Sequence, residues 1–128
     1  MGVLGFSHVQ LVVRDVPTSA AWYRAVLGVE EFVAGTITSG PYVGLRHPTG
    51  RFVIGLQTAT PEQAADLTAT SVDHLSFAVA DRAELDEAVA TLTAQGITSQ
   101  PLREEVASWN VRFASPDGVT VELTAPKR

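Results

Sequence analysis

Three residues of types that bind metals lie in short apolar segments: His8, His74 and Glu122. Both histidines are followed by apolar residues at alternate positions, as in a half-buried strand. Glu122 lies in "VTVELTA" (119–125), an apolar strand pattern in which an unpaired carboxylate would be costly to bury. A bound metal would compensate this charge. Two imidazoles and one carboxylate form a triad with open coordination positions, suited to Fe(II), Mn(II) or a similar divalent ion.

An internal repeat gives the two histidines equivalent positions, whereas either one alone would be interpreted as a core or surface residue. "SHVQLVVRD" (7–15) aligns with "DHLSFAVAD" (73–81) at an offset of 66 residues. "GLQTA" (55–59) aligns with "VELTA" (121–125) at the same offset, and the turns "HPTG" and "SPDG" precede them. By this alignment the first-half counterpart of Glu122 is Leu56, which cannot bind a metal. Three protein ligands are therefore expected and not four.

Each half of the chain has the pattern strand, helix and then three strands, which predicts an α+β fold of two tandem βαβββ modules. The first helix has Asp15 as its N-cap, Pro17 in its first turn and Gly28 at its end. Its predicted buried face comprises Ala21, Trp22, Ala25 and Val26. The second helix spans "RAELDEAVATLTAQG" (82–96), with Leu85, Ala88, Val89 and Leu92 facing inward. The remaining strands are predicted at 30–35, 42–47, 51–57, 97–105, 109–115 and 119–125.

The repeat also predicts where a ligand binds. Two equivalent halves related by a pseudo-twofold axis would bring both first strands to a shared cleft, and ligand sites are common at such junctions. Alternation puts Gln10 on the strand face of His8, and small or polar neighbours are typical of a pocket floor. Tyr42, Phe52 and Leu56 are expected to line the first-half side of the cleft.

Two residues of the second half have alternative roles. Arg112 either holds an anionic substrate or pairs with a surface glutamate. Trp109 either stacks on a planar ligand or is a partly buried packing residue.

Composition narrows the class of protein. The chain has 128 residues, 45% of them hydrophobic and 18% charged, which indicates a single globular domain over residues 1–128 with repeats at about 5–59 and 71–126. The net charge of −5 and the scattered basic residues argue against nucleic acid or an anionic membrane as a partner. The absence of cysteine excludes disulfides and thiolate ligands. With no apolar run of membrane-spanning length and no signal-peptide pattern, we expect a cytoplasmic location.

The chain resembles the vicinal oxygen chelate superfamily, which includes glyoxalase I, bleomycin- and fosfomycin-resistance proteins, methylmalonyl-CoA epimerase and extradiol dioxygenases. The resemblance covers nearly the whole chain and rests on "HVQLVVRDVPTSAAWYRAVLG", "DHLSFAVAD" and "FASPDGVTVELTAP". It implies a curved, cup-shaped mixed sheet with helices outside. It also implies metal ligands on the first and last strands of each half, which correspond to His8, Leu56, His74 and Glu122.

The leucine distinguishes this chain from glyoxalase I and the epimerase, whose designs have four ligands. The remaining set is similar to that of extradiol dioxygenases and fosfomycin-modifying transferases. However, the only spare histidine is His47, and no potassium-binding loop is recognisable. Lyase, dioxygenase and transferase activities therefore all stay open, and no catalytic acid or base is nominated.

The resemblance favours a metal-dependent enzyme in which a divalent Fe, Mn, Zn, Co or Ni ion acts as a Lewis acid on a small oxygen-rich substrate. The alternative is a metal-free protein that sequesters an antibiotic or metabolite, and a third possibility is an inherited but idle triad. A homodimer is expected, because each module leaves an open sheet edge. If modules are exchanged between chains, His8 comes from one chain and His74 and Glu122 from the other.

Overall fold

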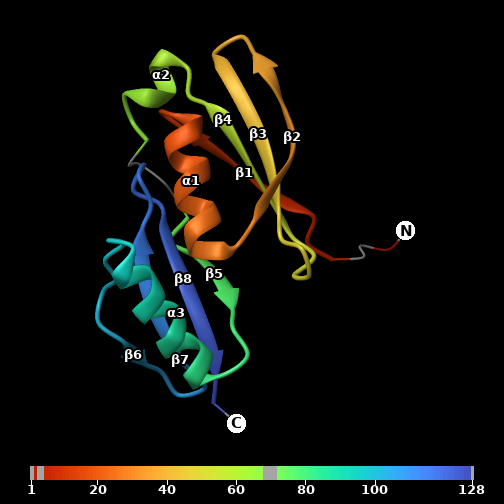
Figure 1. Ribbon diagram of the computed structural model, residues 1–128. Coiled ribbons are helices and arrows are strands. Elements are labelled where there is room, and N and C mark those ends of the chain that lie inside the picture. The colour runs from red at the N-terminus through yellow and green to blue at the C-terminus, as the bar shows by residue number, and fades with distance from the viewer. Residues whose placement is uncertain (1, 3–4, 68–71, 128) are drawn as a thin grey trace. The chain divides into compact units, whose positions relative to one another are not determined.

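The computed structural model describes residue 2 and residues 5–67 and 72–127, and the chain divides into two compact units, residues 1–69 and 70–128. Each unit contains one mixed four-stranded sheet and one long helix (Figure 1). The predicted α+β fold of tandem βαβββ modules is confirmed, with a separate sheet in each module.

The first unit begins with β1 (His8–Val13) and α1 (Val16–Leu27), followed by β2 (Glu30–Ile37), β3 (Gly40–Arg46) and β4 (Val53–Thr58). The strand order is β1-β4-β3-β2; β1 runs parallel to β4, and the other pairs are antiparallel. A short helix that was not predicted, α2 (Pro61–Ala64), follows β4. It is held by a capping box in which Thr60 and Gln63 bind each other's backbone N–H groups.

The second unit repeats this order with β5 (Leu75–Ala78), α3 (Arg82–Ala94), β6 (Arg103–Glu104), β7 (Ser108–Ala114) and β8 (Thr120–Pro126). Its strand order is β5-β8-β7-β6, with β5 parallel to β8. The strand predicted at 97–105 is reduced to the two residues of β6. None of the helices in the described part of the chain has the length and hydropathy needed to span a bilayer.

The caps of α1 are as predicted, and its buried face is so in part, because Val26 is buried as expected. Asp15 accepts a hydrogen bond from the backbone N–H of Thr18 at 3.0 Å, and Gly28 ends the helix with φ 68°. Ala21 and Ala25 are exposed. The buried residues are Val16, Ser19, Ala20, Tyr23, Val26 and Leu27. Burying Tyr23 and Leu27 against the sheet removes much more apolar surface from water than burying two alanines, which explains this orientation of the helix.

In each unit the helix covers one face of the sheet and leaves the other face without a helix (Figure 1). α1 packs on β3 and β4, and α3 packs on β7 and β8, with Leu85 and Leu92 buried. The sheets supply large apolar core residues, among them Leu45, Ile54 and Phe113. Because strand side chains alternate, every second residue of the same strands lies on the opposite face.

The register of the strands corrects the predicted equivalence of Leu56 and Glu122. Gln10 pairs with Gly55, and Ser76, its counterpart in the repeat, pairs with Glu122. The counterpart of Glu122 is therefore Gly55, at an offset of 122 − 55 = 67 residues. The preceding turns agree, because the residues with positive φ are Arg51 and Gly118, again 118 − 51 = 67 apart. Leu56 is completely buried, on the other face of β4.

Candidate functional site

Corresponding cross-strand rows lie on the helix-free face of each sheet. The first row consists of Gln10, Gly55 and Gly44 on β1, β4 and β3. The second row consists of Ser76, Glu122 and Arg112 on β5, β8 and β7. Directly paired residues place their side chains next to each other on one face. The two rows therefore occupy equivalent positions of the repeat. The first row contains no charged residue, whereas the second contains Glu122 and Arg112.

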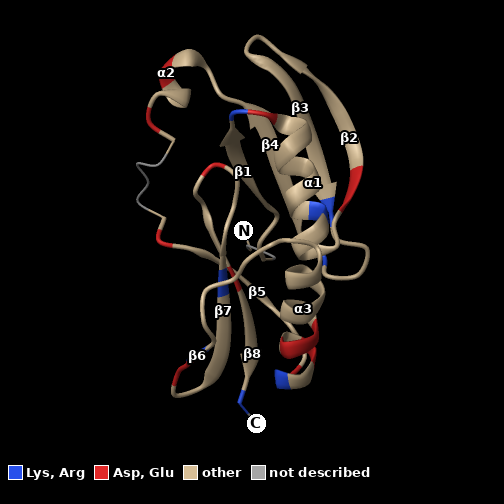
Figure 2. Ribbon diagram, turned by 60° about the vertical axis from the view of Figure 1, so that its left-hand side comes forward, with Lys and Arg blue, Asp and Glu red and all other residues tan. Residues whose placement is uncertain are grey.

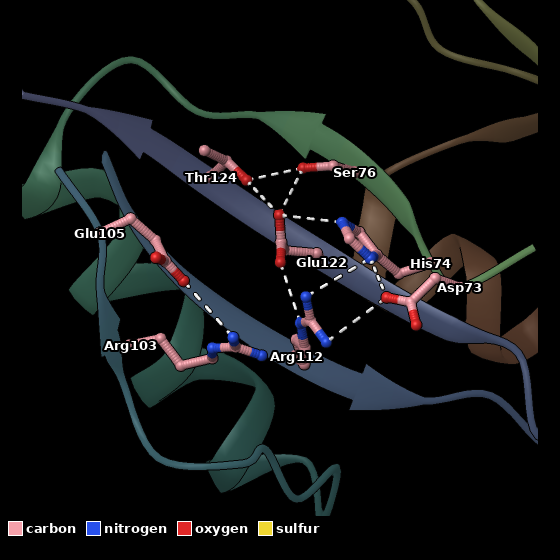
Figure 3. A network of polar contacts seen from close by, with 8 residues as sticks. All are labelled: Asp73, His74, Ser76, Arg103, Glu105, Arg112, Glu122 and Thr124. Atoms are coloured by element: carbon pink, nitrogen blue, oxygen red, sulfur yellow. Dashed lines mark hydrogen bonds and ion pairs between the residues drawn. The ribbon is translucent and has the colours of Figure 1, made fainter. Parts of the chain in front are cut away.

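Glu122 is the centre of a polar cluster around the second row (Figure 3). Its side chain is only 8% exposed. Oε1 accepts hydrogen bonds from Ser76 Oγ and Thr124 Oγ1, both at 2.9 Å, and Oε2 accepts one from Arg112 Nε at 3.0 Å. β7 and β8 carry only these two charged residues, Arg112 and Glu122, in otherwise uncharged strands (Figure 2). The carboxylate is thus held in a fixed orientation by three donors.

His74, just before β5, presents one ring nitrogen to Glu122. Its Nδ1 lies 2.7 Å from Asp73 Oδ2, and its Nε2 lies 3.7 Å from Glu122 Oε1. Because the Asp73 carboxylate only accepts hydrogen bonds, it fixes the proton of the neutral ring on Nδ1. The lone pair of Nε2 then points toward another acceptor, an arrangement that favours a cation between the two atoms.

Arg112 lies beside both of these residues. Besides its bond to Glu122, its guanidinium has one nitrogen 3.8 Å from Asp73 Oδ2 and another 3.4 Å from His74 Nδ1. Its side chain is 19% exposed, whereas that of Asp73 is 82% exposed. Of the two roles considered for Arg112, the structure shows ion pairing, but with Glu122 itself and not with a surface glutamate.

The surroundings keep both carboxylates ionised. Burial raises the pKa of Glu122, but hydrogen bonds from Thr124, Arg112 and Ser76 and attraction to His74 together hold it below its usual value. The pKa of Asp73 is lowered by its hydrogen bond to His74 and by the attraction between the two groups. A negative charge is therefore present at Glu122 near neutral pH.

The first unit has a cavity of about 400 Å³ on the side of its first row. His8, Gln10, Phe32, Tyr42, Gly44 and Gly55 are among the residues that line it. A methyl group added to Gly55 would collide with the Gln10 amide, so the glycine lets this side chain lie against the strand. The Gln10 amide nitrogen donates to Gln57 at 3.0 Å. The predicted pocket residues His8, Gln10 and Tyr42 thus come together in the first unit.

The imidazole rings of His8 and His74 make equivalent contacts. Ser7 Oγ lies 3.0 Å from Nδ1 of His8, as Asp73 Oδ2 lies 2.7 Å from Nδ1 of His74. In both cases the residue before the histidine contacts Nδ1. This local contact leaves Nε2 as the nitrogen that each histidine can offer to a ligand.

Three predicted binding residues lie elsewhere in their units. Trp109 pairs with Ala125 on the α3 face of its sheet, with Arg82 and Lys127 each 5.3 Å from its ring centre, so it is a packing residue. Phe52 stacks on His47 at 5.3 Å, and Leu56 is in the core. The positions of Trp109 and Leu56 follow from strand alternation once the register is known.

Four residues of the second unit belong to the cluster or border it but were not among the predicted site residues: Asp73, Ser76, Thr124 and Asn110. The first three contact His74 or Glu122. Asn110 is 4% exposed, lies on the same face of β7 as Arg112, and its Oδ1 has no hydrogen-bond partner among the described residues. The sequence offered one signal for the first three residues, because each is a polar residue close to a predicted metal ligand along the chain or across the strand pair. It offered no such signal for Asn110.

The cluster fits part of a metal site. Bonds from a metal to nitrogen or oxygen are about 2.0–2.2 Å long, so two atoms on one ion lie at most roughly 4.3 Å apart. The 3.7 Å between His74 Nε2 and Glu122 Oε1 meets this condition. The Asp73 contact resembles the carboxylates that orient metal-binding histidines. Across residues 5–67 and 72–127, no three His, Asp or Glu side chains form a group that could hold a metal.

Comparison with known proteins identifies the family. A sequence profile of the Glyoxalase/Bleomycin resistance protein/Dioxygenase superfamily matches residues 5–123. The chain belongs to this superfamily. The predicted resemblance is thereby confirmed, and superfamily membership accounts for the tandem βαβββ modules. No curated protein sequence matches the chain significantly.

Solved structures of the superfamily fold match over almost the full length. A glyoxylase/bleomycin resistance protein/dioxygenase domain from Frankia sp. EAN1pec is 28% identical, with a TM-score of 0.81, covering 98% of this chain and 100% of that one. The fosfomycin resistance protein FosX from Listeria monocytogenes is 21% identical, with a TM-score of 0.77 and coverages of 98% and 96%. An integron cassette protein from the Halifax Harbour sewage metagenome is 20% identical, with a TM-score of 0.75 and coverages of 96% and 99%.

Proposed function

We propose that this member of the superfamily is a metal-dependent enzyme acting on a small, oxygen-rich molecule, with His8, His74 and Glu122 as ligands of a divalent ion. His8 comes from the same chain or, if modules are exchanged in a dimer, from a partner chain. The ion would act as a Lewis acid toward two neighbouring oxygens of the substrate. The class of reaction, whether lyase, dioxygenase or transferase, is left open.

One observation carries the proposal. His74 Nε2 and Glu122 Oε1 are two acceptors that face each other at 3.7 Å. In the neutral ring no hydrogen bond joins these two atoms, whereas a divalent ion that replaced one of the hydroxyl donors on Oε1 would bind both. A mutant of FosX from Listeria monocytogenes has been crystallised in complex with Mn(II) and 1S,2S-dihydroxypropylphosphonic acid. That complex supports divalent-metal binding on this fold.

The remaining residues would prepare the site. Asp73 holds the His74 ring by its Nδ1, and Ser76 and Thr124 hold one oxygen of Glu122. Such fixed ligands reduce the conformational entropy lost when an ion binds. Gln10 and Tyr42 line the cavity of the first unit and would contact the substrate.

A second candidate is metal-free binding of an antibiotic or metabolite. The ion pair between Arg112 and Glu122, at 3.0 Å, favours it because the carboxylate already has a compensating charge. A cavity of about 400 Å³ is within the usual size range of small-molecule sites. The two candidates differ in whether the purified chain contains a metal.

Metal content tests the proposal directly. The chain is purified without chelator and without a nickel affinity step, and its metals are measured by inductively coupled plasma mass spectrometry. We expect close to one divalent ion per chain, and at least about a tenfold loss in His8→Ala, His74→Ala and Glu122→Gln, since each removes one of three ligands. His47→Ala is the matched control, because His47 binds backbone N–H groups of its own turn.

A parent protein that is empty and cannot be loaded with Fe, Mn, Zn, Co or Ni would refute the enzyme proposal and favour metal-free binding. If the parent contains metal and the Glu122→Gln variant retains it, the ion binds elsewhere in the molecule. Retention of metal in His8→Ala alone would remove His8 from the ligand set.

A further inference from the structure

The guanidinium of Arg112 occupies the oxygen of Glu122 that its neighbours leave free. We propose that Arg112 is a displaceable internal cation, which neutralises Glu122 in the metal-free protein and is repelled from the carboxylate when a divalent ion binds there. The inference rests on the proposed metal site. It adds a residue that sets the affinity of that site without being one of its ligands.

The hydrogen bonds of Glu122 show why the two cations compete. Ser76 and Thr124 both donate to Oε1, and Arg112 Nε donates to Oε2. These three donors leave one acceptor position on Oε2, next to Arg112, so an ion at Glu122 either replaces a hydroxyl donor on Oε1 or binds Oε2 beside the guanidinium. The side chains of Glu122 and Arg112 are 8% and 19% exposed, so water contributes little to solvating either charge. An ion at Glu122 therefore meets Arg112 at close range.

Electrostatics opposes simultaneous binding. A divalent ion and a guanidinium at Glu122 would place three positive charges beside two negative ones, Glu122 and the more exposed Asp73. At such short distances in a partly buried site, repulsion between cations is much larger than in water. The ion is thus expected to bind Glu122 at the expense of the Arg112 hydrogen bond.

Asp73 gives the displaced guanidinium another partner. Its carboxylate lies 3.8 Å from the nearest Arg112 nitrogen and is 82% exposed. A small movement of the flexible arginine side chain would bring it onto Asp73, where water shares in solvating both groups. Displacement therefore leaves no unpaired charge buried in the sheet.

The test compares metal affinities in the full-length chain. Stripped protein is titrated with Mn(II) or with Zn(II) in phosphate-free buffer by isothermal titration calorimetry, and binding that Glu122→Gln abolishes is assigned to the site. Removing the competing charge-assisted hydrogen bond in Arg112→Gln should tighten this binding by about 10- to 100-fold. Arg112→Lys, which keeps the charge, should gain less.

Arg103→Gln is the matched control. Arg103 is a guanidinium on the neighbouring strand β6, and it pairs with the exposed Glu105 at 3.4 Å (Figure 3). Its removal changes the net charge of the chain by the same amount as Arg112→Gln. The metal affinity of Arg103→Gln should stay within about twofold of the parent, because Arg103 is exposed and its charge is screened by salt.

A second readout needs no variant and remains valid if Arg112→Gln fails to fold. Arginine Nε–H signals are observable by ¹H–¹⁵N NMR, and the Arg112 signal is assigned in the parent. Addition of diamagnetic Zn(II) should shift this signal away from its carboxylate-bonded position, while the Arg103 signal should stay in place. An Arg112 signal that is unaffected at saturating Zn(II) would overturn the proposal.

The outcomes separate this inference from the proposed function. Equal or weaker metal affinity in Arg112→Gln, with a parent that binds metal, overturns the inference and leaves the proposed metal site standing. Metal binding by Arg112→Gln but not by the parent supports the inference and refutes a metal-dependent parent. If neither protein binds metal at Glu122, both are refuted.

Discussion

Glu122 is a carboxylate that the fold keeps charged despite burial. Its neighbours outweigh the cost of desolvation and lower its pKa in the folded chain below 4.5, the usual value for glutamate. Protonation of Glu122 therefore favours the unfolded chain. The stability that this group contributes is complete above about pH 4.5 and is lost as the pH falls through the lower folded-state pKa.

Glu122→Gln should remove this dependence. Near pH 7 the variant should unfold with a free energy roughly 1–3 kcal/mol lower than that of the parent, because Arg112 loses a charged partner. The difference should narrow as the pH is lowered toward roughly 3, where the parent also loses the charge. Urea unfolding across this range measures both values. Glu105→Gln, at an exposed ion pair, is the control, and an identical pH profile for parent and Glu122→Gln would contradict the prediction.

For single residues, the sequence indicates candidate site residues but not the side chains that they contact. Glu122 was predictable because a carboxylate in an apolar strand needs compensation, and His74 because the repeat duplicates it at His8. The pairing of Arg112 with Glu122 depends on which residues of β7 and β8 lie opposite each other. Alternation alone leaves that register open, and so the arginine and the tryptophan three residues before it kept two interpretations each.

Among the elements, the helices were predicted most accurately at their ends. Asp15 and Gly28 lie at the two ends of α1 as expected, because helix capping depends on local hydrogen bonds and on backbone conformation. Ala21 and Ala25 on the predicted buried face of α1, and the counterpart of Glu122, were wrong, because both predictions depend on packing or pairing between distant segments. The last strands were aligned at an offset of 66 residues, one fewer than the 67 that their pairing with the first strands gives.

Gly28→Ala tests the contribution of a helix end. Gly28 has φ 68°, a left-handed conformation that costs an alanine about 1 kcal/mol, and the variant should be destabilised by that amount in urea unfolding. No atom of the described residues lies within 4 Å of a methyl group added to Gly28, so no collision contributes. Gly2→Ala, also free of contacts but without positive φ, should leave stability unchanged. Equal effects of both substitutions would argue against conformational strain.

On the scale of the whole molecule, we propose that the chain forms a homodimer. The edge strand β2 exposes apolar side chains, with Phe32 at 46%, Val33 at 43% and Ile37 at 39%. Exposed apolar edge strands tend to pair with another chain unless charge protects them. Light scattering should therefore give twice the mass of one chain.

Ile37→Lys should shift this equilibrium toward monomer, because a lysine on an edge strand opposes pairing. Val106→Lys is the control, since Val106 is a 99% exposed apolar residue in a loop and not on β2. A monomeric parent would refute the dimer, and a dimer that is unaffected by Ile37→Lys would locate the contact away from this strand.

The two rows have an evolutionary consequence. After duplication, the same three positions diverged into Gln10, Gly55 and Gly44 beside a cavity and into Ser76, Glu122 and Arg112 around a charge. Under the proposed function, mutations near the cavity would change which molecules fit, and mutations near the charge would change reactivity. Because the rows belong to separate modules with separate cores, selection can alter substrate preference in one while conserving the chemistry of the other.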